Sequence, residues 1–380
     1  MGEVIERIRK AVPSGLGRKL WVKSGGRCEY DGCNTPLWKD SLMQQAMNKA
    51  YISHIIAASS DGPRGHLVLS EKLELEFSNL MLLCDECHNR IDMAQAKVHT
   101  VERLQKMKKD HEDRIELLTG LTIEKKSHII LYGAKIGQHQ SPLNYSEASS
   151  TIIPERYPVT DRALELGLKN CEFEDKSPEY WEFQESQLVG SFERQIKSLL
   201  GSDQTQHFSL FGLAPQPLLV KLGTLLPDIY HVDTYQRHRE PQTWKWQNSS
   251  TNIEFELKEP ENKSRTPVLV VSLSATITDD RIHKVLGNGI SIWKMAIQNP
   301  DNDFLKTKHI LSGFRNQMRR AFDVIKAHHD KSEPLHVFPA MPVSAAVEMG
   351  RVWMPKADMA LVIYDENHKK GGFVKAMELK

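Results

Sequence analysis

Two pairs of cysteines near the N-terminus have the spacing of metal ligands. The first pair is Cys28 and Cys33, and the second pair is Cys84 and Cys87. Thiolates arranged in two close pairs favour a tetrahedral zinc ion, and four of them fill its coordination sphere. Such a zinc has no open position for water, so we expect it to stabilise the fold rather than react. The alternative is a group of four reduced core thiols.

Three polar residues beside these cysteines have the types needed to hydrolyse a phosphodiester. His54 lies in an apolar run, where a satisfied core histidine is the alternative, and His88 directly follows Cys87. His88 and Asp92 are four residues apart and share one face of a helix, so together they can hold a divalent cation. Mg²⁺ or Mn²⁺ suits this work. A histidine facing that cation can take a proton from an attacking water.

Two arginines near these groups are candidate contacts to a DNA backbone. The formal net charge is +1, so any nucleic-acid surface must be local. Arg27 belongs to a basic N-terminal stretch, and Arg64 lies in the sequence Asp-Gly-Pro-Arg-Gly at 61–65. A solvated helix face is the alternative for the first, and an ordinary turn is the alternative for the second.

The elements that must position these residues belong to a small first domain over 1–120. It closes with a helix at 100–118, where apolar residues recur at three- and four-residue steps. Glycine, serine and proline are frequent over 121–160, which we interpret as a linker that contains one strand at 128–132. A second domain then covers 161–380.

The second domain alternates between strands and helices. Strands are predicted at 207–213, 229–235, 267–275, 290–297, 335–340 and 359–364, and helices at 218–226, 304–328 and 342–350. This order predicts an α/β domain with parallel sheets covered by helices on both faces, arranged as two Rossmann-like units.

Ligands of such sheets bind at the carboxyl ends of the strands. Proline-rich loops at two of these ends offer Pro215, Gln216, Met341 and Pro342 as candidate ligand contacts. A third group follows another strand and supplies cations and flat rings that suit phosphates and bases; it comprises Arg237, Arg239, Trp244 and Trp246. Core packing is the alternative for each tryptophan.

The sequence gives no sign of a membrane-bound or secreted protein. It opens without an apolar signal segment, and no apolar run approaches the ~18 residues that span a bilayer. We therefore expect a cytoplasmic protein with reduced thiols, in which the fifth cysteine, Cys171, is a plain thiol.

Residues 18–118 resemble the ββα-metal fold of HNH nucleases of the cysteine-knuckle kind. The matching residues are Cys28, Cys33, His54, Asn79, Cys84, Cys87 and His88. The resemblance implies that His54 is the general base. It also implies that Asn79 stabilises the loop between two strands and so holds His54 in its orientation. It also implies that His88 is a catalytic metal ligand, with Asp92 as a second one. The family often has an acidic or histidine ligand before the base, where this chain has Ser53. The resemblance therefore implies a cation shell that needs the substrate phosphate.

Residues 160–380 resemble the SAVED sensor domain, which is similar to two fused CARF-type Rossmann units and binds cyclic oligonucleotides. The matching segments are 335–342, 350–351, 355–358 and 363–365. With an HNH domain in front, the chain resembles the nuclease effector of bacterial CBASS anti-phage systems. This implies activation by a cyclic di- or trinucleotide, homo-oligomerisation, and cleavage of double-stranded DNA in antiviral defence.

Two other functions remain open at this point. One is a modification-dependent restriction endonuclease whose C-terminal domain reads DNA, although 160–380 shows no basic stripe. The other is a non-catalytic zinc-knuckle DNA-binding regulator, in which His54 would have no role in catalysis.

Overall fold

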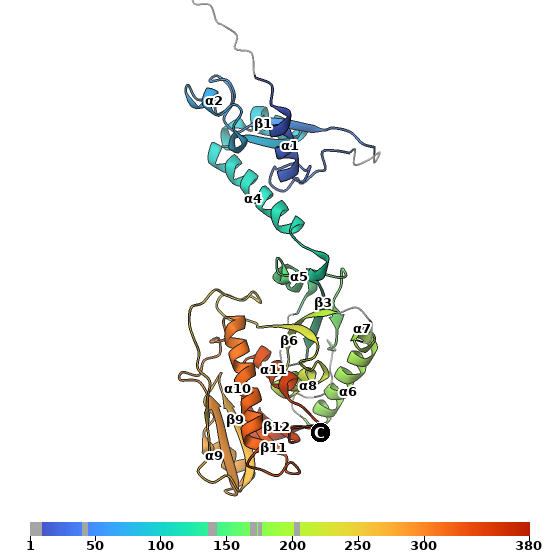
Figure 1. Ribbon diagram of the computed structural model, residues 1–380, viewed down its shortest axis with the longest axis vertical. Helices are drawn as coiled ribbons and strands as arrows, with labels where there is room; N and C mark the ends of the chain where they lie inside the picture. The colour runs from blue at the N-terminus through green and yellow to red at the C-terminus, as the bar shows by residue number, and fades with distance from the viewer. Residues whose placement is uncertain (1–9, 40–44, 136–142, 168–172, 174–176, 201–205) are drawn as a thin grey trace, which may run out of the picture. The chain divides into compact units, whose positions relative to one another are not determined.

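The computed structural model describes residues 10–39, 45–135, 143–167, 173, 177–200 and 206–380. Cys171 lies outside these ranges, so the prediction of a plain thiol there is untested. The chain forms two compact units, Met1–Thr122 and Ile123–Lys380, shown in Figure 1. Among the described residues, no helix is both long and apolar enough to cross a membrane.

The first unit is built on two antiparallel strands followed at once by a helix. Strand β1 pairs with β2 in a register that sets His54 opposite Leu80. The principal elements are α1 (Ser14–Lys23), β1 (Ala50–His54), β2 (Leu80–Cys84), α3 (Asp85–Asn89) and α4 (Val101–Thr119). Short turns of helix complete the unit, namely α2 (Leu69–Lys72), η1 (Phe77–Asn79), η2 (Arg90–Ala94) and η3 (Ala96–Val98).

The core of this unit is small and includes two of the cysteines. Cys28 and Cys87 are buried among apolar side chains of β2 and of the helices that follow it. Helix α4 lies within one residue of the predicted span at each end and buries Leu104 and Met107, while the Thr100 hydroxyl caps its first turn. A unit with so little apolar core needs an additional stabilising element.

The second unit contains two sheets whose central parallel strands follow the same order. In the first sheet the order is β4 (Tyr157–Pro158), β3 (Lys126–Gly133), β6 (His207–Leu213) and β7 (His231–Tyr235), and β5 (Leu164–Glu165) also pairs with β3. In the second sheet the order is β13 (Gly372–Leu379), β12 (Leu361–Asn367), β11 (Leu335–Ala340), β9 (Thr266–Ser272), β10 (Ile290–Ala296) and β8 (Glu256–Lys258). Only the edge strands β13 and β8 run antiparallel to their neighbours.

Each sheet is doubly wound. In the first sheet β3 lies between β4 and β6, with β7 beyond β6; in the second sheet β9 lies between β10 and β11, with β12 beyond β11. The chain therefore reverses its winding between β3 and β6, and again between β9 and β11. The helices are α5 (Tyr145–Ile152), α6 (Pro178–Gln195), α7 (Lys197–Leu200), α8 (Gln216–Leu225), α9 (Asp279–Leu286), α10 (Lys308–Lys326) and α11 (Val343–Val352), with η4 (Ile123–Lys125) and η5 (His368–Lys370) as single turns. The predicted pair of Rossmann-like units is confirmed.

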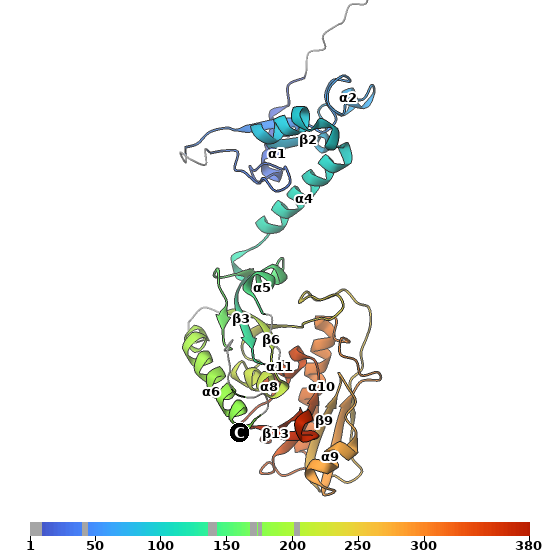
Figure 2. The same ribbon diagram turned by 180° about the vertical axis from the view of Figure 1, so that it is seen from behind.

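Strand β9 shows how the second sheet is covered on both faces. Val268 and Val270 pack in a cluster with residues of α9. Leu269 and Val271 belong to the main core with residues of α10 and α11. Successive side chains of a strand point to opposite faces, so a strand covered on both sides is apolar throughout, as predicted. Figure 2 shows this unit from behind.

Helices α8 and α11 join the two sheets. Each helix has a proline at its N-cap, Pro215 in α8 and Pro342 in α11. Each also has a glycine at the same distance beyond that proline, Gly223 and Gly350, and the two glycines meet where the helices cross. A Cβ at Gly350 would lie 2.0 Å from the Val220 carbonyl oxygen. Only glycine permits this close approach.

The crossing gives a stability prediction. Because the obstructing atom at Gly350 is backbone, Gly350→Ala must separate the helices, and we expect a loss of about 2 kcal/mol or more. The matched control is Gly289→Ala, since a Cβ there has open space. Chemical denaturation of both variants checks this, and equal midpoints would contradict it.

A buried histidine makes the stability of the second unit depend on pH. Burial lowers the pKa of His207 from its ordinary value of 6.5 to about 4, although the Asp233 carboxylate acts in the opposite direction. His207 Nδ1 lies 2.9 Å from the Ser127 hydroxyl. Below the ordinary histidine pKa, His207 takes up a proton in the unfolded chain but not in the native one. The free energy of unfolding is therefore at its full value above that pKa. It falls as pH drops towards 4, by about 3 kcal/mol. We expect His207→Gln to flatten this loss in denaturation curves collected from pH 7 to 4; an unchanged slope would contradict the assignment.

Two parts of the sequence-based description need correction. Residues 143–160 are not a linker, because they contain α5 and β4. Helix α5 begins after Asn144, whose side-chain oxygen accepts from the Glu147 amide at 2.8 Å. The edge strands β8 and β13 were not predicted. The serine-rich sequence of α5 and the 3-residue length of β8 give weak local signals, and the packing of the unit overrides them.

Candidate functional site

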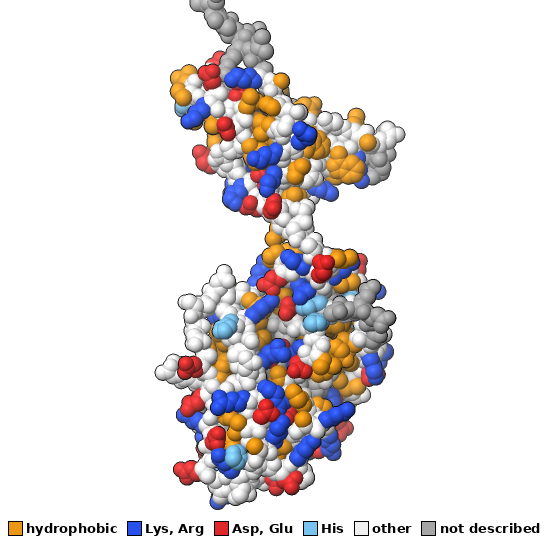
Figure 3. All heavy atoms as spheres, viewed as in Figure 1, with side chains coloured by type: hydrophobic (Ala, Val, Ile, Leu, Met, Phe, Trp, Pro, Cys, Tyr) orange, Lys and Arg blue, Asp and Glu red, His pale blue; other side chains and the backbone are white. Residues whose placement is uncertain are grey.

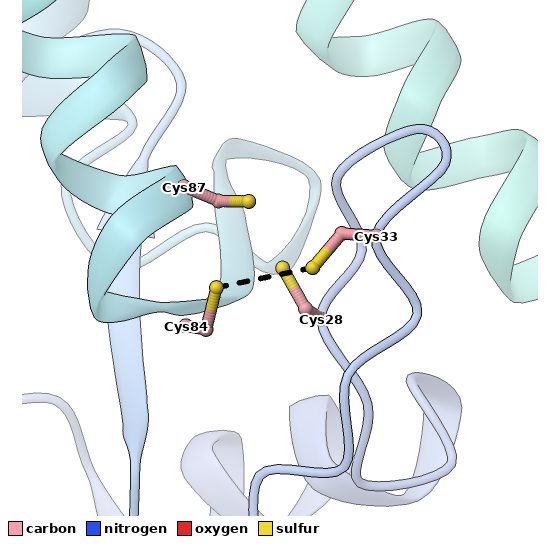
Figure 4. A group of neighbouring side chains, drawn as sticks. All are labelled: Cys28, Cys33, Cys84 and Cys87. Atoms are coloured by element: carbon pink, nitrogen blue, oxygen red, sulfur yellow. Dashed lines mark hydrogen bonds between the residues drawn. The ribbon is translucent and has the colours of Figure 1, made fainter.

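The four cysteines of the first unit converge on one point. Their sulfur atoms all lie within 4.8 Å of one another, and Figure 4 shows them pointing inward from two segments. Cys28 and Cys33 flank a turn, Cys84 ends β2, and Cys87 lies in the first turn of α3. In the part of the chain that the structure describes, this is the one group of three or more Cys, His, Asp or Glu ligands so placed.

The residue types and spacing of this cluster would suit a zinc ion. Sulfurs bound to one zinc at ~2.3 Å lie roughly 3.8 Å apart, and the Cys33 and Cys84 sulfurs are separated by 3.9 Å. Burial raises the pKa of Cys28 to about 12 and also raises that of Cys87. Buried thiolates this close need a cation to balance their charge. The four cysteines therefore fit a metal ion whose coordination shell they fill completely.

A cleft of about 270 Å³ lies in the same unit, where β1 faces the helix that follows β2. Its lining residues are Ser53, His54, Ala57, Ala58, Ser59, Pro63, Glu74, His88 and Asp92. The structure thus brings together His54, His88 and Asp92, as the sequence predicts. His54 is 7% exposed, and its Nε2 lies 3.0 Å from the Glu74 carbonyl oxygen.

His88 is held from three sides within this cleft. Its Nδ1 lies 2.8 Å from the Ser53 hydroxyl and 3.3 Å from Asp92 Oδ2. The Tyr51 ring stacks on the imidazole with centroids 5.1 Å apart and an angle of 16°. Asp92 lies in η2, a single π-turn that continues α3, and such turns are frequent at functional sites. Ser53, His88 and Asp92 therefore direct oxygen and nitrogen atoms at one position.

Asn79 supports the chain directly after His54. Its side-chain oxygen accepts from the Ile56 amide at 2.8 Å, and its side-chain nitrogen donates to the Ile56 carbonyl at 2.9 Å. The same nitrogen lies 3.1 Å from the Leu73 carbonyl oxygen. Asn79 thus ties the end of β1 to the segment before β2.

The two candidate DNA contacts have different surroundings. Arg27 is half-buried and donates to the Asn34 carbonyl at 3.1 Å, beside the cysteine cluster. The prediction that Arg64 contacts DNA is wrong, because its side chain is only 8% exposed and forms an ion pair with Asp92. A guanidinium used in this way does not present itself to a DNA backbone.

Sequence reasoning missed one residue that lines this cleft and one that packs on His88. Glu74 is buried, with its carboxylate accepting from the Lys10 backbone amide at 2.8 Å. Tyr51 contacts His88 from the neighbouring strand. Neither lies at a diagnostic spacing, and the alternation of β1, which places Tyr51 and Ser53 on one face, was the available signal for the second.

In the second unit, loops from several strand ends meet. The Gln216 side-chain oxygen accepts from the Met341 amide at 3.2 Å, which places the end of β6 beside the end of β11. Gln236, which follows β7 and was not predicted, accepts from the Ser344 amide and hydroxyl at 3.2 and 2.8 Å. Pro215 and Pro342 are buried at the helix N-caps of this junction. Four predicted residues are thus together, and their contact with a ligand stays a prediction.

The other four candidates lie in the segment after β7. The prediction that Trp244 stacks on a base of the ligand is wrong. Its side chain is 2% exposed and packs edge-on against Phe211, which leaves no free face for a base. The Arg237 guanidinium lies over the Trp244 ring and pairs with Glu147. Trp246 is half-buried and lines an open hollow of about 600 Å³ that also includes Lys308 and His309 at the start of α10. Arg239 is exposed.

Comparison with known proteins identifies part of the second unit. Residues 191–379 match the SAVED family, described as the SMODS-associated and fused to various effectors sensor domain. No curated protein matches the chain.

Similar solved structures are distant in sequence. The Acinetobacter baumannii Cap4 SAVED/CARF-domain containing receptor with the cyclic trinucleotide 2'3'3'-cAAA is 13% identical, with a TM-score of 0.41 over 82% of this chain and 61% of that chain. The same receptor with 3'3'3'-cAAA is 12% identical, with a TM-score of 0.44 over 83% and 68%. The Moraxella osloensis Cap4 receptor is 13% identical, with a TM-score of 0.37 over 82% and 69%. The chain thus spans less than two thirds of the first of these receptors. On the family match, residues 191–379 of this chain form a SAVED sensor domain.

Proposed function

We propose that this chain is a DNA endonuclease of the HNH type, activated when its SAVED domain binds a cyclic di- or trinucleotide, and that it acts in CBASS antiviral defence. The observation that carries the proposal is the cleft that His54, His88 and Asp92 line together. That cleft lies beside a four-cysteine cluster, on the same chain as a sensor domain.

His54 has the environment of a general base. A carbonyl oxygen only accepts hydrogen bonds, so the contact from Nε2 to the Glu74 carbonyl requires the proton to be on Nε2. Nδ1 then carries the lone pair that takes a proton from the attacking water. Asn79 holds the chain directly after His54 and so maintains its orientation.

His88 and Asp92 would hold a divalent cation, Mg²⁺ or Mn²⁺. When bound, that ion offsets charge on the phosphate and on the leaving oxygen. The Tyr51 ring fixes the plane of the His88 imidazole. Ser53 is a weak ligand, so few protein groups complete the shell and the DNA phosphate supplies a further oxygen.

The sensor end of the chain supplies the regulation. The SAVED match covers both strand ends of the junction between α8 and α11, where ligands of doubly wound sheets bind. The Acinetobacter receptor was solved with cyclic trinucleotides, which makes those compounds the first probes. We propose that binding drives homo-oligomerisation and brings two nuclease units onto opposite DNA strands.

The face of the second unit seen in Figure 3 gives little support to a C-terminal DNA reader. On the face shown in Figure 3, lysines and arginines of the second unit are interspersed with acidic side chains. Sequence-independent DNA binding needs a continuous basic surface. The sensor proposal therefore stands ahead of the restriction-enzyme alternative.

A melting-temperature screen of the full chain tests the sensor function. The compounds are 3'3'3'-cAAA, 2'3'3'-cAAA and a set of cyclic dinucleotides, with linear tri-adenylate as the control. A ligand that binds only the native state at a hundred times its Kd stabilises it by about 2.7 kcal/mol. We expect one cyclic compound to raise the melting temperature and to shift the oligomeric state. No response to any compound would contradict the sensor proposal.

A further inference from the structure

Three acceptors hold the Arg64 guanidinium beside Asp92, a residue that lines the cleft. Nε donates to the Ile55 carbonyl at 2.7 Å, one terminal nitrogen donates to the Ile91 carbonyl at 2.8 Å, and the other donates to Asp92 Oδ1 at 2.6 Å. These acceptors belong to the end of β1 and to η2. The positive charge is therefore held against Asp92.

The local sequence is shaped to place this side chain. Arg64 has a φ of 58°, in the left-handed region that is rare for residues other than glycine. A Cβ on the next residue, Gly65, would lie 2.3 Å from the Ser60 carbonyl oxygen, so the turn closes too tightly for any other residue. A tight, strained turn directs Arg64 back to the site rather than into solvent.

The fixed charges around the cleft nearly cancel. Two carboxylates line it, and each faces a cation: Asp92 pairs with Arg64, and Glu74 lies 3.7 Å from the Lys10 ammonium. Hard divalent cations bind to sites with surplus negative oxygens. This cleft offers one carboxylate oxygen, Asp92 Oδ2, beside the His88 imidazole, and the negative charge of that carboxylate is already balanced.

We propose that Arg64 keeps the cation site of the resting nuclease weak by neutralising Asp92, so that the cation binds firmly only together with a DNA phosphate. The inference rests on the proposed function, which assigns Asp92 as a cation ligand. A phosphodiester brings the missing negative charge, so DNA and cation bind cooperatively.

The size of the effect follows from Coulomb's law. A unit charge roughly 5 Å from a divalent ion changes its binding by at least about tenfold, even with the dielectric constant of water. Removing the charge of Arg64 should therefore tighten cation binding, whereas loss of a purely structural contact would loosen it.

The test is Mn²⁺ binding to the zinc-loaded full chain, followed by the electron paramagnetic resonance of free Mn²⁺. Arg64→Met removes the charge and keeps the apolar stem, and Arg64→Lys keeps the charge while losing the three-way hydrogen bonding. Arg64→Gln replaces Arg64→Met if that variant does not fold. Asp92→Asn defines the part of Mn²⁺ binding that belongs to this site.

We expect Arg64→Met to bind Mn²⁺ at least about tenfold more tightly than wild type and Arg64→Lys to stay within threefold of it. In a His54→Ala background, where cleavage is suppressed, a short DNA duplex should tighten Mn²⁺ binding more in the Arg64 protein than in Arg64→Met. Equal or weaker binding by Arg64→Met would overturn the inference. Unchanged binding in Asp92→Asn would overturn the cation assignment as well, and a wild-type chain that binds Mn²⁺ in this way but cuts no DNA would sink the nuclease proposal alone.

Discussion

Replacing His54 with alanine is expected to lower the rate of DNA cleavage by about 10²–10⁴-fold, which is the usual contribution of a positioned general base. The methyl group cannot take a proton from water, and nothing else in the described cleft is oriented as His54 is by the Glu74 carbonyl. His54 is not a cysteine-cluster residue, so zinc content and melting temperature should remain near those of wild type. Single-turnover cleavage of a labelled duplex measures the rate.

The matched control for this variant is His66→Ala. His66 lies in the same segment and accepts from the Val68 and Leu69 amides, but it does not line the cleft. We expect this control to cut at a rate within a few fold of wild type. Retained cleavage by a folded His54→Ala protein would support the non-catalytic regulator instead.

Replacing Cys84 with serine is expected to unfold the first unit. Structural zinc contributes roughly 10–16 kcal/mol in small zinc-dependent domains at neutral pH, while this unit has a small core of its own. A serine hydroxyl does not replace a thiolate, so the ion is lost along with this stabilisation. Elemental analysis should show loss of about one zinc per chain, and limited proteolysis should digest the first unit while the second resists.

Cys171→Ser is the control for the cysteine variant, because Cys171 is the remaining cysteine of the sequence and lies outside the two pairs. The Cys171→Ser protein should keep its zinc, and its first unit should stay resistant to protease. A folded Cys84→Ser protein with full nuclease activity and no metal would show that the cluster is a set of core thiols.

The parts of the structure that follow from the sequence are those with strong local signals. The strand at 335–340 has the predicted bounds, because a continuous apolar run before a Pro-bounded helix leaves few alternatives. The helix of 100–118 is displaced by one residue at each end. The sequence singled out the cysteines, His54, His88 and Asp92 because metal and catalytic chemistry restricts residue type and spacing, and the structure places the cysteines in one cluster and the other three in one cleft.

Other features depend on contacts between distant segments, and no local pattern predicts them. The burial of Trp244, which lies in the loop after β7, results from its packing on Phe211 of β6. Arg64 lies in a sequence that is typical of an exposed turn, yet it forms an ion pair with a carboxylate from beyond β2. The contact of Gln236 with Ser344 was also unpredictable from local sequence, because it forms only where the two sheets join at α8 and α11.

The measurement that tests the central claim most directly is conversion of supercoiled plasmid by the full chain in Mn²⁺. It is made with and without the cyclic oligonucleotide that raises the melting temperature, in wild type and in His54→Ala. The account predicts rapid conversion only when wild type and ligand are combined, with neither protein active alone. Equal cleavage by wild type with and without ligand, or ligand-dependent cleavage by His54→Ala, would contradict it.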